Sequence, residues 1–368
     1  MKIKKLIISL DLGASASKGM YSIYENIDDT SPKTTETITM EPEIAKVPIE
    51  LLEEEQANFA RSSPENVAWI AYKAQDEEGI AIGRAAKKYV LSGEQIESVK
   101  YQFATDKCLA FIGVIASKHG ISDDILEIVL NLLIPSDEKQ SRQALEKSIR
   151  KRLKRFYFRK KLISCRLSEF NLQIEGIGGL FYRMEQNQEC ESKIIVVLML
   201  GHRNCSCLVF DKGNFSHDSI RLGYYDYIQN IKERSIGQKI EDLEYVMPQI
   251  EKEPERMDFW LGHLIRGHQC SDREQERLKL TEAITISKGL HWQKVSRWLD
   301  RKIPNRLDEI LIFGGASRGF KQELTQKFFW AENVDWGEET SNELEKFGIE
   351  ESMLYRFADV FGLHKQYI

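Results

Sequence analysis

A strand–turn–strand pattern near the start of the chain constrains the fold more than any other feature. Residues 5–10 form a short apolar run typical of a buried strand, and residues 19–24 can return beside it in a hairpin. The turn between them contains Gly13 and small hydroxylated residues, which allow backbone N–H groups to point into a concavity and bind an anion. The pattern predicts a phosphate-binding hairpin, with an ordinary β-hairpin as the alternative.

The side chains around this turn suit a phosphate and its metal ion. Asp11 ends the first strand, where a carboxylate can hold magnesium through the water shell of the ion. Lys18 follows the turn and can set its charge against a terminal phosphate. Ser15 and Ser17 add hydroxyl donors.

The same pattern returns in the second half of the chain. Residues 194–200 and 205–211 predict a second hairpin with a buried first strand. Its turn reads Gly201, His202, Arg203 and Asn204. Some ATPases clamp a triphosphate between two such hairpins, one from each domain.

A third glycine turn lies near the end of the chain. Residues 308–312 predict an apolar strand and residues 320–330 a helix. The turn between them contains Gly314, Gly315 and Ser317. A strand, a glycine turn and a helix start form a natural site for a ribose or a phosphate.

Glu175 is, together with Asp11, a candidate for catalytic chemistry. A strand is expected to end at this residue, and the glycines after it open a helix at residues 180–185. A carboxylate at a strand end beside a phosphate site can align a water molecule for in-line attack.

Composition describes a globular protein without an overall attraction to nucleic acid or membrane. The chain of 368 residues is long enough for two domains, and it is 42% hydrophobic and 30% charged with a net charge of -5. The first apolar run stops at Asp11, too early for a signal peptide, and no run approaches the roughly 18–20 apolar residues of a membrane span. The six scattered cysteines therefore indicate reduced thiols, and we expect a cytoplasmic protein.

The remaining elements follow from periodicity and turn residues. Strands are expected at residues 67–73, 79–83 and 125–131, and two more within 156–172. Helices are expected at residues 84–91, 102–118 and 138–153, through most of 224–299, and at 350–361, where Gly362 ends the helix.

Residues 150–161 hold eight Lys and Arg side chains in twelve positions, interleaved with Phe156, Tyr157 and Phe158. We interpret this segment as a helix end followed by an edge strand protected by charge. A nucleic-acid patch is the alternative.

Four motifs, at residues 11–18, 175–179, 201–211 and 314–317, occur in the order used by the actin superfamily. Over nearly its whole length the chain most resembles the bacterial ParM/StbA type of actin-like protein, which is involved in plasmid segregation. Residues 79–85 resemble the strand-to-helix signature of the first domain of that type. Residues 355–362 are similar to its C-terminal helix.

The resemblance implies an α/β, actin-like two-domain fold with duplicated ribonuclease H-like cores and a nucleotide cleft between the domains. Domain I would span residues 1–172, with a small subdomain inserted at about 36–100. Domain II would span residues 173–345, and residues 346–368 would return to domain I as a helix.

The resemblance also assigns roles to residues. It matches Asp11, Gly13, Ser15 and Lys18 to the first phosphate loop, Gly201 to the second loop, and Gly314, Gly315 and Ser317 to the adenosine segment. It makes Glu175 the residue that orients the attacking water.

One departure concerns the second loop. Met199 stands where the ParM type has an aspartate, so a carboxylate that helps to organise magnesium and water is missing. His202 and Arg203 instead add donors for phosphate. We therefore expect nucleotide binding with slow hydrolysis.

The function implied is a protein that binds ATP or GTP with magnesium and assembles head to tail into filaments. Its partners would be further copies of itself and a DNA-binding adaptor for plasmid segregation, with no membrane and no direct nucleic-acid contact. A non-hydrolysing scaffold or adaptor, and a small-molecule kinase on the same fold, are the alternatives.

Overall fold

The computed structural model describes residues 3–59, 61–90, 98–121, 125–267 and 269–368. The chain forms two compact units, one made of Met1–Gln188 with Glu338–Ile368 and the other of Glu189–Gly337. The chain therefore passes from one unit to the other after residues 188 and 337, whereas the expected boundaries follow residues 172 and 345. The reason is that α5 (Ile177–Gln186) and α11 (Glu338–Glu345) both pack against α12 (Glu351–Lys365), the last helix of the first unit.

The main sheet of the first unit has five strands in the order β10-β7-β1-β2-β3. They are β1 (Ile3–Leu12), β2 (Ser17–Tyr24), β3 (Thr34–Met40), β7 (Ile125–Ile134) and β10 (Cys165–Ile174). The first three form an antiparallel meander, whereas β7 runs parallel to both β1 and β10. The predicted first hairpin is confirmed.

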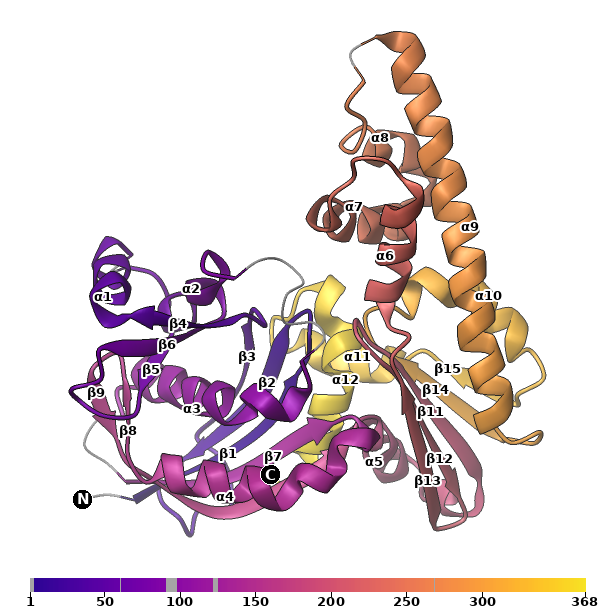
Figure 1. Ribbon diagram of the computed structural model, residues 1–368. Coiled ribbons are helices and arrows are strands. Elements are labelled where there is room, and N and C mark those ends of the chain that lie inside the picture. Colours follow the sequence, from indigo (N-terminus) through magenta and orange to yellow (C-terminus); the bar gives the residue numbers. More distant parts are fainter. Residues whose placement is uncertain (1–2, 60, 91–97, 122–124, 268) are drawn as a thin grey trace. The chain divides into compact units, whose positions relative to one another are not determined.

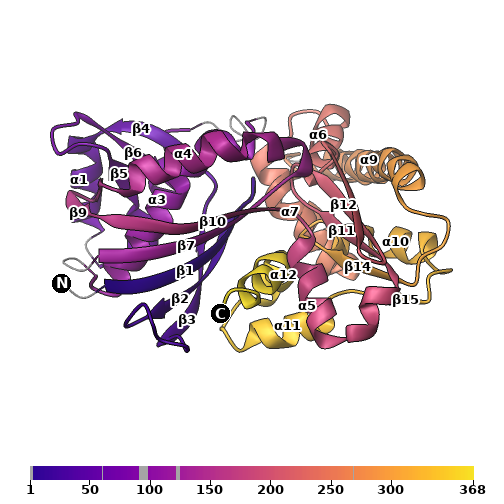
Figure 2. The ribbon, with the colours of Figure 1, turned by 90° about the horizontal axis from the view of Figure 1, so that it is seen from below.

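Helices cover both faces of this sheet (Figure 1). Side chains alternate along a strand, so Leu6, Ile8 and Leu10 join one core with α3 (Lys100–Lys118) and α4 (Arg142–Leu153). The intervening residues of β1 face the other way, where Ser9 bonds to His364 of α12. Figure 2 shows α12 beside α5.

A second sheet of the first unit has the strand order β4-β6-β5-β8-β9. Its strands are β4 (Ile44–Pro48), β5 (Trp69–Ala71), β6 (Glu78–Ile82), β8 (Phe156–Phe158) and β9 (Lys161–Ile163), and its helices are α1 (Ile49–Asn58) and α2 (Arg84–Lys87). The expected insertion at residues 36–100 is therefore wrong in part, because β8 and β9 complete the sheet from later in the chain. Helix α2 ends at Lys87, before the expected limit at Leu91, which lies outside the described residues.

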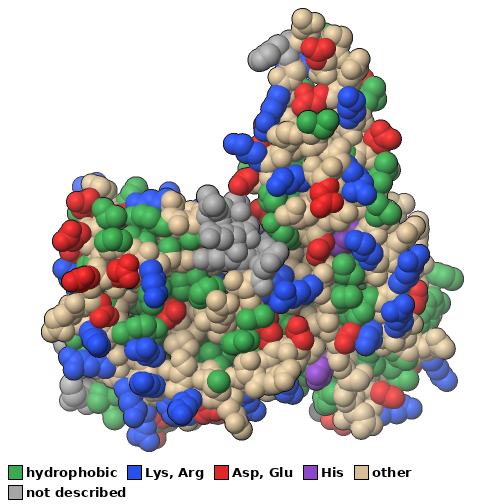
Figure 3. Space-filling view, in the orientation of Figure 1, with side chains coloured by type: hydrophobic (Ala, Val, Ile, Leu, Met, Phe, Trp, Pro, Cys, Tyr) green, Lys and Arg blue, Asp and Glu red, His purple; other side chains and the backbone are tan. Residues whose placement is uncertain are grey.

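The basic segment at residues 150–161 has the expected structure only in part, because β8, the strand that follows the helix end, lies between β5 and β9 and is not an edge strand. Helix α4 ends at Leu153, and β9 is an edge strand of the smaller sheet. Phe156 and Phe158 are buried, so two of the interleaved aromatic rings point into the core. Lys and Arg side chains gather at the lower left of Figure 3, over α4, β8 and β9.

The second unit repeats the topology of the main sheet. Its strand order is β13-β12-β11-β14-β15, an antiparallel meander of three strands followed by two parallel strands. The strands are β11 (Ile194–Leu200), β12 (Cys205–Asp211), β13 (Asn214–Ile220), β14 (Glu309–Phe313) and β15 (Asn333–Asp335). The predicted duplicated core is confirmed.

Helices of the second unit pack on one apolar face of this sheet. They are α6 (Tyr224–Arg234), α7 (Ile240–Lys252), α8 (Met257–Leu261), α9 (Cys270–Lys302) and α10 (Lys321–Lys327). The 33 residues of α9 span about 50 Å at 1.5 Å per residue. Short 3₁₀ turns occur at Pro64–Val67, Ser136–Ser141, Gln188–Ser192, Pro254–Arg256 and Arg318–Phe320.

The prediction that Gly362 ends the last helix is wrong. Helix α12 continues to Lys365, because Gly362 lies at a close crossing with α5. A Cβ atom at Gly362 would lie 2.0 Å from the carbonyl oxygen of Gly178, so neither helix leaves room for a side chain there. The glycine permits the crossing of the two helices instead of stopping one of them.

Within the described part of the chain, no helix combines the length and the apolar character needed to cross a membrane. All six cysteines are free thiols.

Candidate functional site

The two predicted catalytic carboxylates meet at one edge of the main sheet in the first unit. Asp11 lies near the carboxyl end of β1 and Glu175 directly follows β10, and the carboxyl ends of β1, β7 and β10 share this edge. The ammonium of Lys100 joins them, with Nζ 2.6 Å from Asp11 Oδ1 and 2.5 Å from Glu175 Oε1. All three side chains are largely buried.

Lys18 completes the group from the neighbouring strand. It is the cross-strand partner of Asp11, and its Nζ lies 2.6 Å from Asp11 Oδ2. Burial alone would raise the pKa of Asp11, but Lys100 and Lys18 together hold it well below the usual value. Burial lowers the pKa of Lys18, and the nearby charges of Arg356 and Lys100 lower it further, although Asp11 acts in the opposite direction.

Sequence reasoning missed Lys100. The helix was expected to begin at residue 102, which left this lysine in a loop, whereas it is the first residue of α3. A cation in the first turn of a helix opposes the helix dipole, and this mismatch was the available signal. The buried carboxylates Asp11 and Glu175 account for it, because they raise its pKa despite the burial.

The turn at residues 13–16 carries the other predicted residues of the first loop. Gly13 and Ser15 are partly exposed there. Ser15 Oγ accepts a hydrogen bond of 2.6 Å from Nη2 of Arg356 in α12. The hydroxyl of Ser17 is buried and has no hydrogen-bond partner among the described residues, which suits a polar ligand at the turn.

Residues 176–179, which connect Glu175 to α5, are held by hydrogen bonds to α12. The carboxylate of Asp359 accepts backbone N–H bonds of 2.7 Å from Gly176, 2.8 Å from Gly178 and 3.3 Å from Gly179. These are the orphan donors at the start of α5, so an acidic side chain already occupies that helix N-terminus. Burial, with the charges of Asp11 and Glu175, raises the pKa of Asp359 to about 7.

In the second unit, the predicted second loop is joined to the start of α6. Carbonyl oxygens of Gly201, His202 and Arg203 accept hydrogen bonds from the backbone at residues 223–225. His202 Nε2 lies 2.9 Å from Glu244 Oε1, so this ring contacts a carboxylate. The amide oxygen of Asn204 is buried without a partner in the described part of the chain.

The third predicted turn lies against the second. Gly314 has a φ of +96°, and a Cβ atom there would lie 2.4 Å from the carbonyl oxygen of Leu200. Ser317 Oγ donates to the Gly314 carbonyl oxygen at 2.7 Å, whereas Gly315 is exposed. The ends of the parallel strands β11 and β14 thus bring the Gly201 and Gly314 turns together within the second unit.

The residues of the first unit fit an anionic ligand better than a metal ion alone. Among the described residues, no group of three His, Cys, Asp or Glu side chains could hold a metal. Each Asp11 oxygen accepts one ammonium contact and keeps a further lone-pair site, enough to meet the water shell of a magnesium ion. The lysines and the unpartnered Ser17 hydroxyl are suited to phosphate oxygens.

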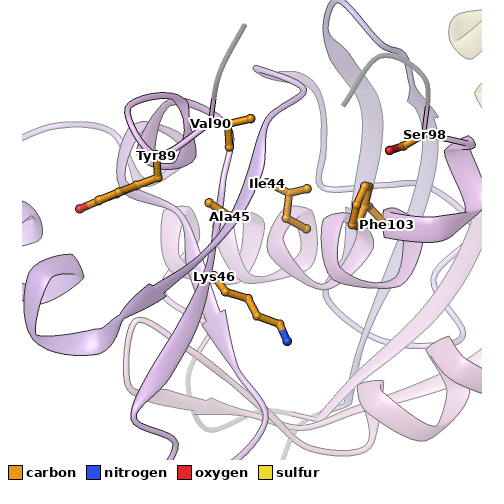
Figure 4. Close-up of a pocket in the computed structure, with 7 residues that line it drawn as sticks. All are labelled: Ile44, Ala45, Lys46, Tyr89, Val90, Ser98 and Phe103. Carbon is orange, nitrogen blue, oxygen red and sulfur yellow. The ribbon is translucent and has the colours of Figure 1, made fainter. Parts of the chain in front are cut away.

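A hollow of about 370 Å³ lies elsewhere in the first unit (Figure 4). Its lining includes Ile44, Lys46, Tyr89 and Phe103. It is bordered by the chain on both sides of residues 91–97, which lie outside the described residues, and it contains none of the predicted site residues.

Comparison with known proteins finds similarity in structure alone. Neither a scan of protein-family models nor a search of curated proteins finds a match. The crystal structure of the apo psk41 ParM protein is 14% identical, with a TM-score of 0.54 over 100% of this chain and 97% of that one. The Alp12 filament structure is 14% identical, with a TM-score of 0.56 over 98% of each chain.

Ta0583, an archaeal actin homologue solved in complex with ADP, is 12% identical, with a TM-score of 0.51 over 98% of each chain. At these identities the similarity establishes the fold. The chain has an actin-like fold over its whole length, and similar structures include ParM and other actin-like proteins.

Proposed function

We propose that this chain is a nucleotide-dependent, filament-forming actin-like protein that binds ATP or GTP with magnesium. The observation that carries the proposal is the buried group of Asp11, Lys18, Lys100 and Glu175 beside the glycine turn of the first hairpin. Buried charges are costly, and such a concentration at one sheet edge is typical of a functional site. The ADP complex of a structural neighbour supports a nucleotide as the ligand.

The two units would bind different parts of the nucleotide. In the first unit, Gly13, Ser15, Ser17 and Lys18 would bind phosphate, and Asp11 would hold magnesium through water. The second unit would contribute the turn of Gly201, His202, Arg203 and Asn204 to the phosphates, and Gly314, Gly315 and Ser317 to the adenosine. The bound metal would neutralise charge on the phosphates.

Glu175 would align the attacking water, and hydrolysis would be slow for two reasons. Lys100 Nζ contacts one oxygen of Glu175 and so competes with a water molecule for that oxygen. Met199 is largely buried in β11, so position 199 offers no carboxylate to the metal or the water. Both features favour binding over turnover.

Assembly is the proposed consequence of binding. A head-to-tail interface between identical chains does not close on itself and yields a filament. The Alp12 filament among the structural neighbours supports self-assembly. The biological role proposed is plasmid or DNA segregation in the cytoplasm, through a DNA-binding adaptor.

Calorimetric titration with magnesium and ATP or GTP, followed by light scattering of the same samples, tests the proposal. We expect saturable binding of at least one triphosphate and a rise in scattering that depends on it. Binding of neither nucleotide would contradict the proposal. Binding with flat scattering at all protein concentrations would leave a nucleotide-binding protein but exclude the filament.

A non-hydrolysing scaffold or adaptor is a second candidate, favoured by the contact between Lys100 and Glu175 and by Met199. The two functions differ in phosphate release. Assembly with ATP that releases no phosphate would identify the scaffold, whereas slow release after assembly would identify the ATPase.

A further inference from the structure

Arg356 is a cation at the candidate phosphate site that no part of the proposed function uses. It projects from α12 to the turn at residues 13–16, where Nη2 donates to Ser15 Oγ at 2.6 Å. Its second contact is from Nη1 to the sulfur of Met353 at 3.4 Å, a weak acceptor. Within the described residues, no carboxylate lies within 4.0 Å of the guanidinium.

This arrangement is unusual for a partly buried guanidinium. Arginine keeps its charge and carries five N–H donors, so a site with little solvent normally supplies a carboxylate or several carbonyl oxygens. Burial lowers the pKa of Arg356, and only the charge of Asp11 opposes this effect. The donors of Arg356 are therefore less than fully used.

The acids around the turn have other partners than Arg356. Lys18 and Lys100 together pair with the two carboxylates Asp11 and Glu175. Asp359, the next acid on α12, uses both its oxygens on backbone N–H groups of α5. Among the described residues, none of these acids therefore contacts Arg356, and an anion at the turn would pair with its guanidinium.

We propose that Arg356 binds the terminal phosphate of the nucleoside triphosphate and makes the protein prefer a triphosphate to a diphosphate. The inference rests on the proposed function, because it assigns a further residue to the same site. The planar fork of arginine matches two phosphate oxygens, and Ser15 holds it at the turn that supplies the other phosphate donors. Arg356 is one helical turn from Asp359, so the same helix contacts both the phosphate turn and the connector after Glu175.

The test compares the affinities of ATP and ADP, or of GTP and GDP, for wild type, Arg356→Gln and Arg356→Lys by calorimetric titration. Loss of a charge-assisted contact should weaken triphosphate binding about 10- to 100-fold and change diphosphate binding less than about threefold. Arg356→Lys keeps the charge but loses the planar fork, so its triphosphate affinity should lie between those of wild type and Arg356→Gln. Arg152→Gln is the matched control, because Arg152 stacks on Tyr72 away from the turn.

The outcomes separate the two claims. Equal loss of both nucleotides in Arg356→Gln would overturn the inference while the proposed function stands, because Arg356 would then only hold the turn. If Ser15→Ala also weakens triphosphate and diphosphate binding equally, the hydrogen bond between Arg356 and Ser15 is the cause of that loss. If wild type binds neither nucleotide, the proposed function fails and the inference fails with it.

Discussion

At the residue scale, the candidate site is a group of charges that stabilise one another. Lys100 Nζ reaches both Asp11 and Glu175, and Lys18 holds the other oxygen of Asp11. Removing one partner from a buried ion pair leaves the other charge without compensation, which costs more than the pair itself contributes. The group should therefore respond strongly to substitutions that a surface pair would tolerate.

Lys100→Gln is expected to lower the free energy of unfolding by about 3 kcal/mol or more, because it leaves Asp11 and Glu175 close together without their shared cation. Urea denaturation measures the change. Lys118→Gln is the matched control on the same helix, since Lys118 pairs with Glu36 at the surface and should change stability by less than about 1 kcal/mol. Similar small effects of both substitutions would contradict the importance of the buried group.

Glu175→Gln is expected to retain nucleotide binding and assembly but to stop phosphate release, because the amide cannot accept a proton from the attacking water. Binding by titration and phosphate release on the same sample measure the two properties. Glu169→Gln, an exposed position on β10, the strand that precedes Glu175, should change neither. If Glu175→Gln abolishes binding, the assignment to catalysis is wrong.

At the element scale, α12 connects the parts of the first unit that the candidate site requires. It crosses α5 at Gly178 and Gly362, holds the start of α5 through Asp359, and contacts the phosphate turn through Arg356. Its last turn inserts His364 between Ser9 and Ser22 on the main sheet. A substitution in α12 should therefore alter the candidate site even when the substituted residue contacts no ligand.

Gly362→Ala is expected to destabilise the first unit by about 3 kcal/mol, because its Cβ would lie 2.0 Å from a backbone oxygen that cannot rotate away. Gly289→Ala in α9 is the control, because no atom lies within 4 Å of the added Cβ. It should raise stability by about 0.5–1 kcal/mol through helix propensity. Thermal and urea unfolding measure both, and an unchanged or raised stability of Gly362→Ala would disprove the close crossing.

The burial of Asp359 near two other acids predicts a pH dependence of stability. Its folded pKa is about 7, above the ordinary value of 3.8, so the folded state binds more protons than the unfolded state between these values. Stability from this group is therefore present at low pH and lost as pH rises towards 7. Relative to Asp359→Asn, wild type should lose about 1.4 kcal/mol per pH unit from about pH 4 to 7 and then stay level. Parallel stability–pH curves of the two proteins would contradict the assignment.

At the scale of the whole molecule, one topology occurs twice with different side chains. In both main sheets the first hairpin turn and the ends of the parallel strands lie at the same edge. The first unit places charged groups there, whereas the second unit places the backbone turns of Gly201 and Gly314. This difference is what we expect if the first unit binds the metal and phosphates through charged side chains, and the second unit binds phosphates and nucleoside through its two turns.

Much of the fold could be predicted from the sequence because the hairpins and helices follow from local apolar periodicity and turn residues. The roles of Lys100 and Arg356 could not be predicted, because their partners lie 89 and 341 residues away in the chain. Gly362 was interpreted as a helix stop because a glycine in sequence does not reveal a helix that crosses it. Asp11 and Glu175 were both proposed for the site, but the lysine that joins them depends on tertiary packing.

Electron microscopy of the purified full chain, with magnesium and ATP or GTP and in parallel without nucleotide, tests the central claim most directly. We predict filaments that form only when a triphosphate is present. The absence of filaments with either triphosphate, or equal filaments with and without nucleotide, would contradict it.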